Sequence, residues 1–310
     1  MLIINLMNLF SYFLILLISL ITMAFFTLLE RKTLSSMQIR IGPNKMLFMG
    51  MGQPFNDAIK LFVKMNTQLK NSNMYMYMMS PFFMMLFSFI LWYILPWKSG
   101  FMNSNNSLLL FLVILGLSTY PMIWMSWSSN SKYSMLGCIR MLAQMLSYEV
   151  SLMLFIFLLM IFNISLETKE MLEMNTMYFL LFLFIFILLF IIILAETARS
   201  PFDLTEGESE LVSGFNTEYS AGMFTMIFMT EYMNILLMSY FMVLFFFQPW
   251  SYQMGLMVML IAYMIIWVRG TLPRIRYDLL MMLAWKQIMF IILLLSLYFS
   301  QFKIIMMLFY

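Results

Sequence analysis

The stretch MNTMYFLLFLFIFILLFIIILA, residues 174–195, contains no charged side chain. A helix needs about 20 apolar residues to cross a hydrocarbon core of about 30 Å, so this stretch predicts a membrane-spanning helix. The whole chain has 310 residues, of which 64% are hydrophobic and only 10% are charged, whereas soluble domains carry about 25% charged residues. The sequence therefore predicts an all-α, polytopic integral membrane protein.

Further apolar runs of similar length follow one another with no large polar domain between them. The predicted spans cover residues 2–29, 74–97, 106–127, 139–162, 176–196, 218–246, 252–269 and 285–303 of one membrane domain, residues 1–310. The first span is expected to stay in the mature protein, because it lacks the basic region and the cleavage site of a signal peptide. Gly116 and Pro121 permit a kink in the third span.

Positive charge is distributed unequally between the two sides of this predicted bundle. Of the 17 Lys and Arg residues, only Lys98, Lys169 and Lys303 fall on the side of the termini; the others lie in or beside the odd-to-even loops. Since inner-side loops carry the excess of Lys and Arg, the odd-to-even loops are expected to face the cytoplasm or matrix. Both termini are then expected on the opposite side.

The first inner loop contains a short amphipathic segment, PFNDAIKLFVKM, residues 54–65. Pro54 suits the first turn of a helix. The charged and the apolar faces of this helix are formed, respectively, by Asp57, Lys60 and Lys64 and by Phe55, Ile59, Phe62 and Met65. The pattern is typical of a helix in the membrane interface, and it favours simple anchoring over a direct part in a binding site.

Two carboxylates fall inside predicted spans, Glu149 in the fourth and Glu231 in the sixth. A charged group there costs on the order of 2.5–3.5 kcal/mol on insertion scales, so each is a candidate functional group. Such a group either pairs with a cation or keeps its proton, because burial disfavours the charged form. We expect at least one of the two to be protonated part of the time, as a proton relay requires. The alternative is an inert, protonated Glu hydrogen-bonded between helices.

A third feature is the acidic segment AETARSPFDLTEGESELVSGFNTEYS, residues 195–220, which includes the inner-side loop 197–217. Its acids are Glu196, Asp203, Glu206, Glu208, Glu210 and Glu218. Charge runs usually face water, but this one is interleaved with apolar side chains and connects the spans that carry Glu196 and Glu231. Neighbouring carboxylates in a poorly hydrated space titrate as a coupled group. We therefore interpret the segment as part of a proton path.

The counts of cysteine and histidine limit the chemistry of the chain itself. A single Cys138 and no histidine exclude the usual ligand sets of zinc, haem and iron–sulfur centres. Any redox centre is therefore expected in a partner. No metal site is expected, because the acidic segment lacks the spacing of a calcium-binding loop, and no nucleic-acid partner is expected. Glu30 beside Arg31 and Asp278 beside Arg276 are predicted to form ion pairs that shape the wall of a cavity.

Several sequence motifs occur in the order and spacing of a known family. They are LLERK (28–32), QIRIGPN (38–44), GQPFNDAIKLF (52–62), SYEV (147–150), LAETARSPFDLTEGESELVSGFNTEYSAG (194–222), EY (231–232), RGTLPRIRYD (269–278) and WK (285–286). Through them the chain resembles the subunit 1 family of the proton-pumping NADH:quinone oxidoreductase, respiratory complex I, in its mitochondrially encoded form. It departs from the family pattern at Ala198, where Asn is usual, at Ile41, where a basic residue is frequent, and at Leu279, where Gln is common.

The resemblance implies an eight-helix, multi-pass subunit of the mitochondrial inner membrane, with both termini on the intermembrane-space side. A quinone chamber shared with two hydrophilic subunits would be lined or braced by Glu30, Arg31, Arg40, Arg199, Asp203 and Arg274. An acidic path from that chamber would consist of Glu149, Glu196, Glu206, Glu208, Glu210, Glu218 and Glu231. Ubiquinone would be the substrate. NADH, FMN and the iron–sulfur clusters would be bound by partner subunits, and adjacent small membrane subunits and lipids would be further partners.

Three other functions remain open from the sequence. The homologous membrane subunit of an energy-converting hydrogenase would share the fold but would not use quinone. A carboxylate-gated proton transporter would also carry acids in its spans, although such proteins often show two related halves, and no internal repeat is found here. A pure assembly scaffold is disfavoured, because it has no need of Glu149 and Glu231 within the membrane.

Overall fold

The computed structural model describes residues 2–67, 70, 72–96, 106–163, 167–168, 183–204, 214–247 and 253–309. Within these residues the regular structure is helical throughout, with no strand. Seven helical segments of this described part are long and apolar enough to cross a membrane, and α9 (Leu183–Glu196) is a shorter apolar helix. The prediction of an all-α, polytopic membrane protein is confirmed.

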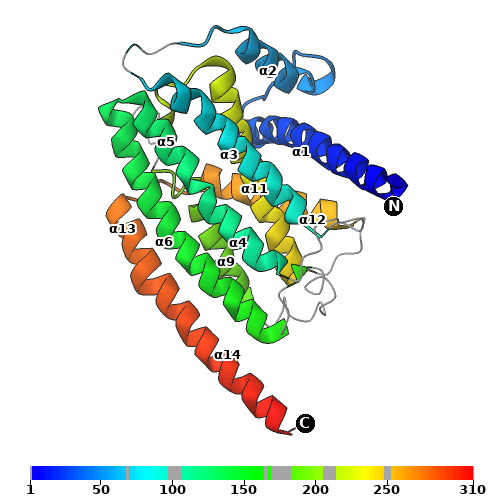
Figure 1. The fold of residues 1–310 in the computed structure, drawn as a ribbon, viewed down its shortest axis with the longest axis vertical. Helices are drawn as coiled ribbons and strands as arrows, with labels where there is room; N and C mark the ends of the chain where they lie inside the picture. Colours follow the sequence, from blue (N-terminus) through cyan, green and yellow to red (C-terminus); the bar gives the residue numbers. More distant parts are fainter. Residues whose placement is uncertain are drawn as a thin grey trace.

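The helices of the described residues pack side by side, and α14 runs along one edge to the C-terminus (Figure 1). The longer ones are α1 (Leu2–Met37), α3 (Met74–Ile94), α6 (Lys132–Asn163), α11 (Ala221–Phe246), α12 (Gln253–Thr271) and α14 (Met289–Phe309). The shorter ones are α2 (Gln53–Val63), α4 (Ser107–Leu117), α5 (Thr119–Ser129), α9 and α13 (Tyr277–Met282). Phe48–Gly50 and Gly214–Asn216 form 3₁₀ turns, and the π-helical turn Leu283–Ile288 joins α13 to α14.

Several helices continue past the ends of the predicted spans. α1 runs to Met37, α6 begins at Lys132, and helical structure before the last span begins at Tyr277. Hydropathy finds only the apolar part of a helix, whereas Lys and Arg are good helix formers and can continue it into the interface. α4 and α5 meet at Ser118, between the two residues that permit a kink.

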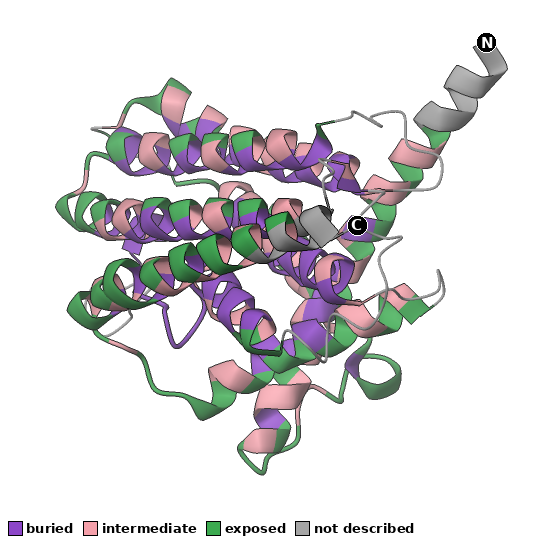
Figure 2. Cartoon of the chain, turned by 90° about the horizontal axis from the view of Figure 1, so that it is seen from below, coloured by how far each residue is buried: buried purple, intermediate pink, exposed green. Residues whose placement is uncertain are grey.

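α11 is the central helix of the described bundle. In its most apolar window 78% of the residues are buried, compared with 17% in α1 and 22% in α12. It packs against α3, α12, α1, α2 and α9. Buried residues line the inside of the bundle, while exposed apolar residues cover outward faces of the peripheral helices (Figure 2). Polar side chains on α11 therefore lie where several helices can meet them.

α2 lies across the ends of the bundle helices (Figure 1) and packs against α1 and α11. Asp57 accepts hydrogen bonds from Arg31 of α1 at 2.5 Å and from Gln53 at 3.0 Å. Ile59 and Phe62 on its apolar face are 62% and 59% exposed. The helix thus has one charged face held to α1 and an apolar face left open, as expected for an interfacial helix.

Candidate functional site

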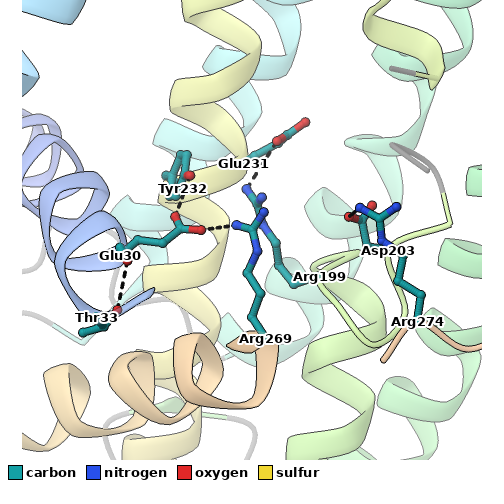
Figure 3. A network of polar contacts seen from close by, with 8 residues as sticks. All are labelled: Glu30, Thr33, Arg199, Asp203, Glu231, Tyr232, Arg269 and Arg274. Carbon is teal, nitrogen blue, oxygen red and sulfur yellow. Dashed lines mark hydrogen bonds and ion pairs between the residues drawn. The ribbon is translucent and has the colours of Figure 1, made fainter. Parts of the chain in front are cut away.

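Glu30, toward the C-terminal end of α1, is the centre of a first cluster. It is only 6% exposed. Tyr232 of α11 donates its hydroxyl hydrogen to Glu30 Oε2 at 2.6 Å, and Arg269 of α12 donates to Oε1 and forms an ion pair (Figure 3). α12 ends two residues after Arg269, shortly before Pro273, which cannot continue a helix. Three helices thereby satisfy one buried carboxylate, as such a group requires.

Glu231, the residue before Tyr232 on α11, belongs to a second cluster. Its Oε2 lies 3.3 Å from Nη2 of Arg199, and the two side chains are 14% and 7% exposed. The guanidinium carbon of Arg199 also lies 4.8 Å from the centroid of the Tyr232 ring, a cation–π distance. Arg199 therefore contacts two consecutive residues of α11 and joins the two clusters (Figure 3).

Arg199 is presented by a tight turn that follows α9. The amide of Thr197 bonds the carbonyl of Ile193 at 2.9 Å, and the amide of Arg199 bonds the carbonyl of Leu194 at 3.2 Å, so the chain reverses at the helix end. Ala198 has a φ of 47°, in the left-handed region. Asn tolerates this region better than Ala. Ala198, at a position where the family usually has Asn, is therefore less favourable for the backbone conformation of this turn. The Ser200–Pro201 peptide bond is cis.

Glu196, the last residue of α9, faces a small cavity together with Arg199, Glu231 and Asn234. Glu196 is 4% exposed. Among the described residues neither of its carboxylate oxygens has a hydrogen-bond partner, and the same holds for Oδ1 of Asn234. The remaining wall is formed by Met84, Met122, Met141, Met145, Thr197, Ala198 and Phe215. The cavity has a volume of about 30 Å³, which leaves room for one or two water molecules.

Glu149 is half-buried on α6 and interacts electrostatically with Glu196. The position of its carboxylate depends on Gly116 of α4. A Cβ at Gly116 would lie 2.6 Å from Glu149 Oε1, so only a residue without a side chain leaves room for this arrangement. Glu149, Glu196 and Glu231 are therefore neighbours in one region of the bundle, although they come from three different helices.

Asp203 and Arg274 form a third pair, 3.3 Å apart, in which Asp203 is 6% and Arg274 is 42% exposed. The amide of Ile275 donates to the carbonyl of Pro201 at 2.9 Å, which holds the segment after α12 along the turn. Figure 3 shows this pair beside the first two clusters. Its arginine has access to the surface, while its carboxylate does not.

The other end of the acidic segment is fixed by aromatic contacts. The rings of Tyr77 and Tyr219 are stacked with centroids 4.3 Å apart, and the Tyr77 hydroxyl donates to the backbone carbonyl of half-buried Glu218 at 2.7 Å. Burial raises the pKa of the Tyr219 phenol, while its contacts with Ser128 and Ser80 lower it. Tyr219 therefore acts as a neutral hydrogen-bonding group.

The remaining candidate residues have different positions. Arg31 is half-exposed and pairs with Asp57 at 2.5 Å, and Arg40 is exposed in the bend after α1. The predicted pair of Glu30 with Arg31 is wrong, because neighbours on a helix point about 100° apart and each finds a partner on another element. Arg276 and Asp278 do pair, at 2.9 Å, although both are exposed. Glu206, Glu208 and Glu210 lie outside the described residues.

Four polar residues of the site were not among the candidates from the sequence: Gln144, Tyr232, Asn234 and Arg269. Tyr232 and Arg269 lie in the motifs EY (231–232) and RGTLPRIRYD (269–278), but neither was predicted to be a site residue. Gln144 and Asn234 are neutral, so an argument from the cost of charge in a membrane does not find them. Within the described residues no group of three or more His, Cys, Asp or Glu side chains could hold a metal ion.

The fold and the site define a polytopic membrane protein in which several helices surround a network of buried ion pairs and carboxylates. Comparison with known proteins matches a family model described as NADH dehydrogenase over residues 10–300. The chain is 45% identical over 286 residues to NADH-ubiquinone oxidoreductase chain 1 of Aedes aegypti, covering 91% of each chain. It is 41% identical over 283 residues to the protein of that name from Apis mellifera ligustica (90% and 92% covered) and 40% identical over 296 residues to that from Didelphis virginiana (92% and 93%). The chain belongs to the NADH dehydrogenase family.

Proposed function

We propose that this chain, as a membrane subunit of an NADH:ubiquinone oxidoreductase, forms the membrane-side wall of the quinone chamber and the first part of a carboxylate path for protons. One observation carries the proposal. Arg199 contacts both Glu231 and Tyr232, and so connects the cluster around Glu30 with the cavity that contains Glu196. A charge that appears on one side of Arg199 therefore acts on groups on the other side.

The chamber residues divide into two groups by exposure. Arg31, Arg40 and Arg274 are exposed or partly exposed on the inner-side elements, where they can meet a quinone head group or a hydrophilic subunit. Glu30, Arg199 and Asp203 are buried and paired, which suits a bracing role. The buried acids hold arginines from α12 and from the segment after it in place.

Quinone reduction takes up two electrons and two protons per quinone, so it changes the charge of the chamber unless protons arrive with the electrons. A negative charge there attracts Arg199 and weakens its hold on Glu231. Glu231 then takes up a proton that Glu196 gives up, relayed by water in the cavity that both acids line, while the amide of Asn234 hydrogen-bonds that water. Glu149, which interacts with Glu196, continues the path. Glu206, Glu208, Glu210 and Glu218 complete it on the inner side.

The assembly follows from the same proposal. The termini lie on the intermembrane-space side of the mitochondrial inner membrane, and the arginine-bearing elements face the matrix. Hydrophilic subunits with NADH, FMN and iron–sulfur clusters cover that face, while small membrane subunits and lipids contact the exposed apolar helices. The relatives are ubiquinone oxidoreductases by name, which favours quinone chemistry over that of a hydrogenase.

The test compares Glu231→Gln with Glu167→Gln in the assembled complex. Glu167 serves as the control, because it is partly exposed in the connection after α6, on the proposed intermembrane-space side and away from the arginines. Glu231→Gln should leave NADH oxidation by an artificial acceptor at the flavin site unchanged, and should lower both quinone reduction and the protons moved per electron pair. The double change Glu206→Gln with Glu208→Gln should lower quinone reduction in the same way. Wild-type quinone turnover and proton stoichiometry in the Glu231→Gln complex would remove the proposed path.

A further inference from the structure

Gln144 of α6 makes two hydrogen bonds that are not part of the function proposed above. Its side chain is fully buried. Its amide nitrogen lies 2.9 Å from the carbonyl oxygen of Ala195 and 2.9 Å from that of Phe202. A primary amide nitrogen carries two hydrogens, so it can donate one to each carbonyl. The two acceptors stand at the two ends of the turn that carries Glu196 and Arg199.

We propose that Gln144 is a positioning residue for the proton path, because it ties both ends of this turn to α6 and thereby fixes where Glu196 and Arg199 lie. The expected effect on quinone turnover rests on the proposed function. The anchoring itself concerns only the geometry of the turn.

The backbone at the end of α9 shows what Gln144 adds. A helix that ends inside a membrane protein leaves carbonyl groups without partners in the helix, and water is scarce there. Each of the two carbonyls accepts one hydrogen bond from the backbone of the turn: Ala195 from the amide of Ala198 at 3.2 Å, and Phe202 from the amide of Leu204 at 3.0 Å. A carbonyl oxygen has two lone pairs, so Gln144 supplies a second donor to each and joins both to α6. A buried glutamine can satisfy two carbonyls at once, which fixes the separation of the two ends of the turn.

The same helix also holds the other end of the acidic segment. A Cβ at Gly137 of α6 would lie 3.0 Å from the Cα of Gly214, so the backbones of α6 and of the 3₁₀ turn Gly214–Asn216 are in close contact. Gly137 and Gln144 are seven residues apart, which places them about 20° apart around the helix axis. One face of α6 therefore contacts the chain on both sides of residues 205–213.

The test uses Gln144→Met in the assembled complex, which keeps the length of the side chain but removes both donors. Ser151→Ala is the control, because Ser151 is equally buried on α6 and its hydroxyl donates to the carbonyl of Tyr148 on the same helix. Backbone amide exchange over residues 195–204 should become roughly tenfold faster or more in Gln144→Met. The infrared carboxyl band that disappears in Glu196→Gln should shift, and quinone turnover should fall. The control should match wild type in all three measurements.

Wild-type exchange together with an unshifted Glu196 band in Gln144→Met would overturn the inference. Faster exchange and a shifted band with wild-type quinone turnover and proton stoichiometry would support the anchor and refute the proposed path. If Gln144→Met fails to assemble, Gln144→Asn answers the same question. Its amide is too short to reach both carbonyls, so exchange should still rise, and wild-type exchange there would equally overturn the inference.

Discussion

The ion pair of Arg199 with Glu231 gives the sharpest quantitative prediction. Arg199→Met removes the positive charge and keeps an apolar stem, while Glu231→Gln keeps the shape of the side chain and removes the negative charge. Each single change leaves one charge without the partner that lies 3.3 Å away in the wild-type protein. The double variant leaves neither charge. The three variants and the wild type form a double-mutant cycle.

The magnitude follows from distance and burial. Two unit charges 3.3 Å apart attract by about 5 kcal/mol at an effective dielectric constant of about 20. Breaking a buried pair by removing one partner typically costs about 3–5 kcal/mol, and these side chains are only 7% and 14% exposed. Losing the cation–π contact of Arg199 with Tyr232 adds about 1 kcal/mol. That loss occurs in both variants that lack Arg199, so it cancels from the interaction term.

The assay is the rate of irreversible heat inactivation of the purified complex, followed by quinone reduction relative to each variant's own starting activity. The double variant should be inactivated much more slowly than the two single variants predict together. The product of the two single-variant rates, divided by the product of the double-variant and wild-type rates, should be at least roughly tenfold, since each 1.4 kcal/mol of interaction corresponds to a factor of ten.

Additive effects, with a ratio near one, would refute this reasoning. They would mean that Arg199 and Glu231 do not stabilise each other in the assembled complex. A parallel cycle of Glu231→Gln with Ser296→Ala is the control. Ser296 lies on α14 at the edge of the bundle and donates to the carbonyl of Leu293 on the same helix, so the ratio of that cycle should stay near one.

Three further predictions concern single contacts. Gly116→Ala should assemble normally, because the new Cβ would lie 2.6 Å from Glu149 Oε1, which is the end of a flexible side chain and can move. The infrared carboxyl band of Glu149 should therefore shift. Gly222→Ala is the control: its Cβ would enter open space, so the band should stay in place. Tyr232→Phe should lower heat stability, since a hydrogen bond to a charged group contributes about 1.5–3 kcal/mol; wild-type stability would show that Glu30 does not need the hydroxyl. Gly137→Ala should speed amide exchange at Gly214–Asn216, because the new Cβ would press on the backbone of Gly214, which must move by a few tenths of an ångström. Gly255→Ala, whose Cβ would enter open space, is the control and should leave this exchange unchanged.

The sequence was most informative where placing a residue in the wrong environment costs much free energy, as for a charge inside a membrane span. A run without charge over residues 174–195 has few alternatives to a helix in lipid, and its described part, residues 183–195, is helical, while residues 174–182 lie outside the described residues. The acids Glu149 and Glu231 stand out for the same reason, since a charge inside a span needs an explanation. Helix ends were less well predicted: Glu30 and Arg31 lie inside α1, beyond the predicted end of its span. Polar residues at the interface can be helical or not, and hydropathy does not distinguish the two.

Partners across the fold could not be predicted from spacing. Glu30 stands next to Arg31 in sequence, yet it bonds Tyr232 and Arg269, more than 200 positions away. Gln144 was not found from the sequence, because an argument from the cost of charge in a span does not apply to a neutral amide. Its role depends on two carbonyls that come together only when α9 ends against α6. Such contacts depend on packing, which periodicity does not specify.

The pairing of consecutive residues on α11 explains how one helix can serve two sites. Side chains at positions 231 and 232 point about 100° apart, so Glu231 faces the cavity with Glu196 while Tyr232 faces Glu30. Helix geometry keeps them from meeting each other, and Arg199 bridges the gap by pairing with the first and lying against the ring of the second. A shift of its guanidinium toward either neighbour weakens the contact with the other. The two clusters are therefore coupled through one side chain, and no large movement of the helices is required for a charge at Glu30 to affect Glu231.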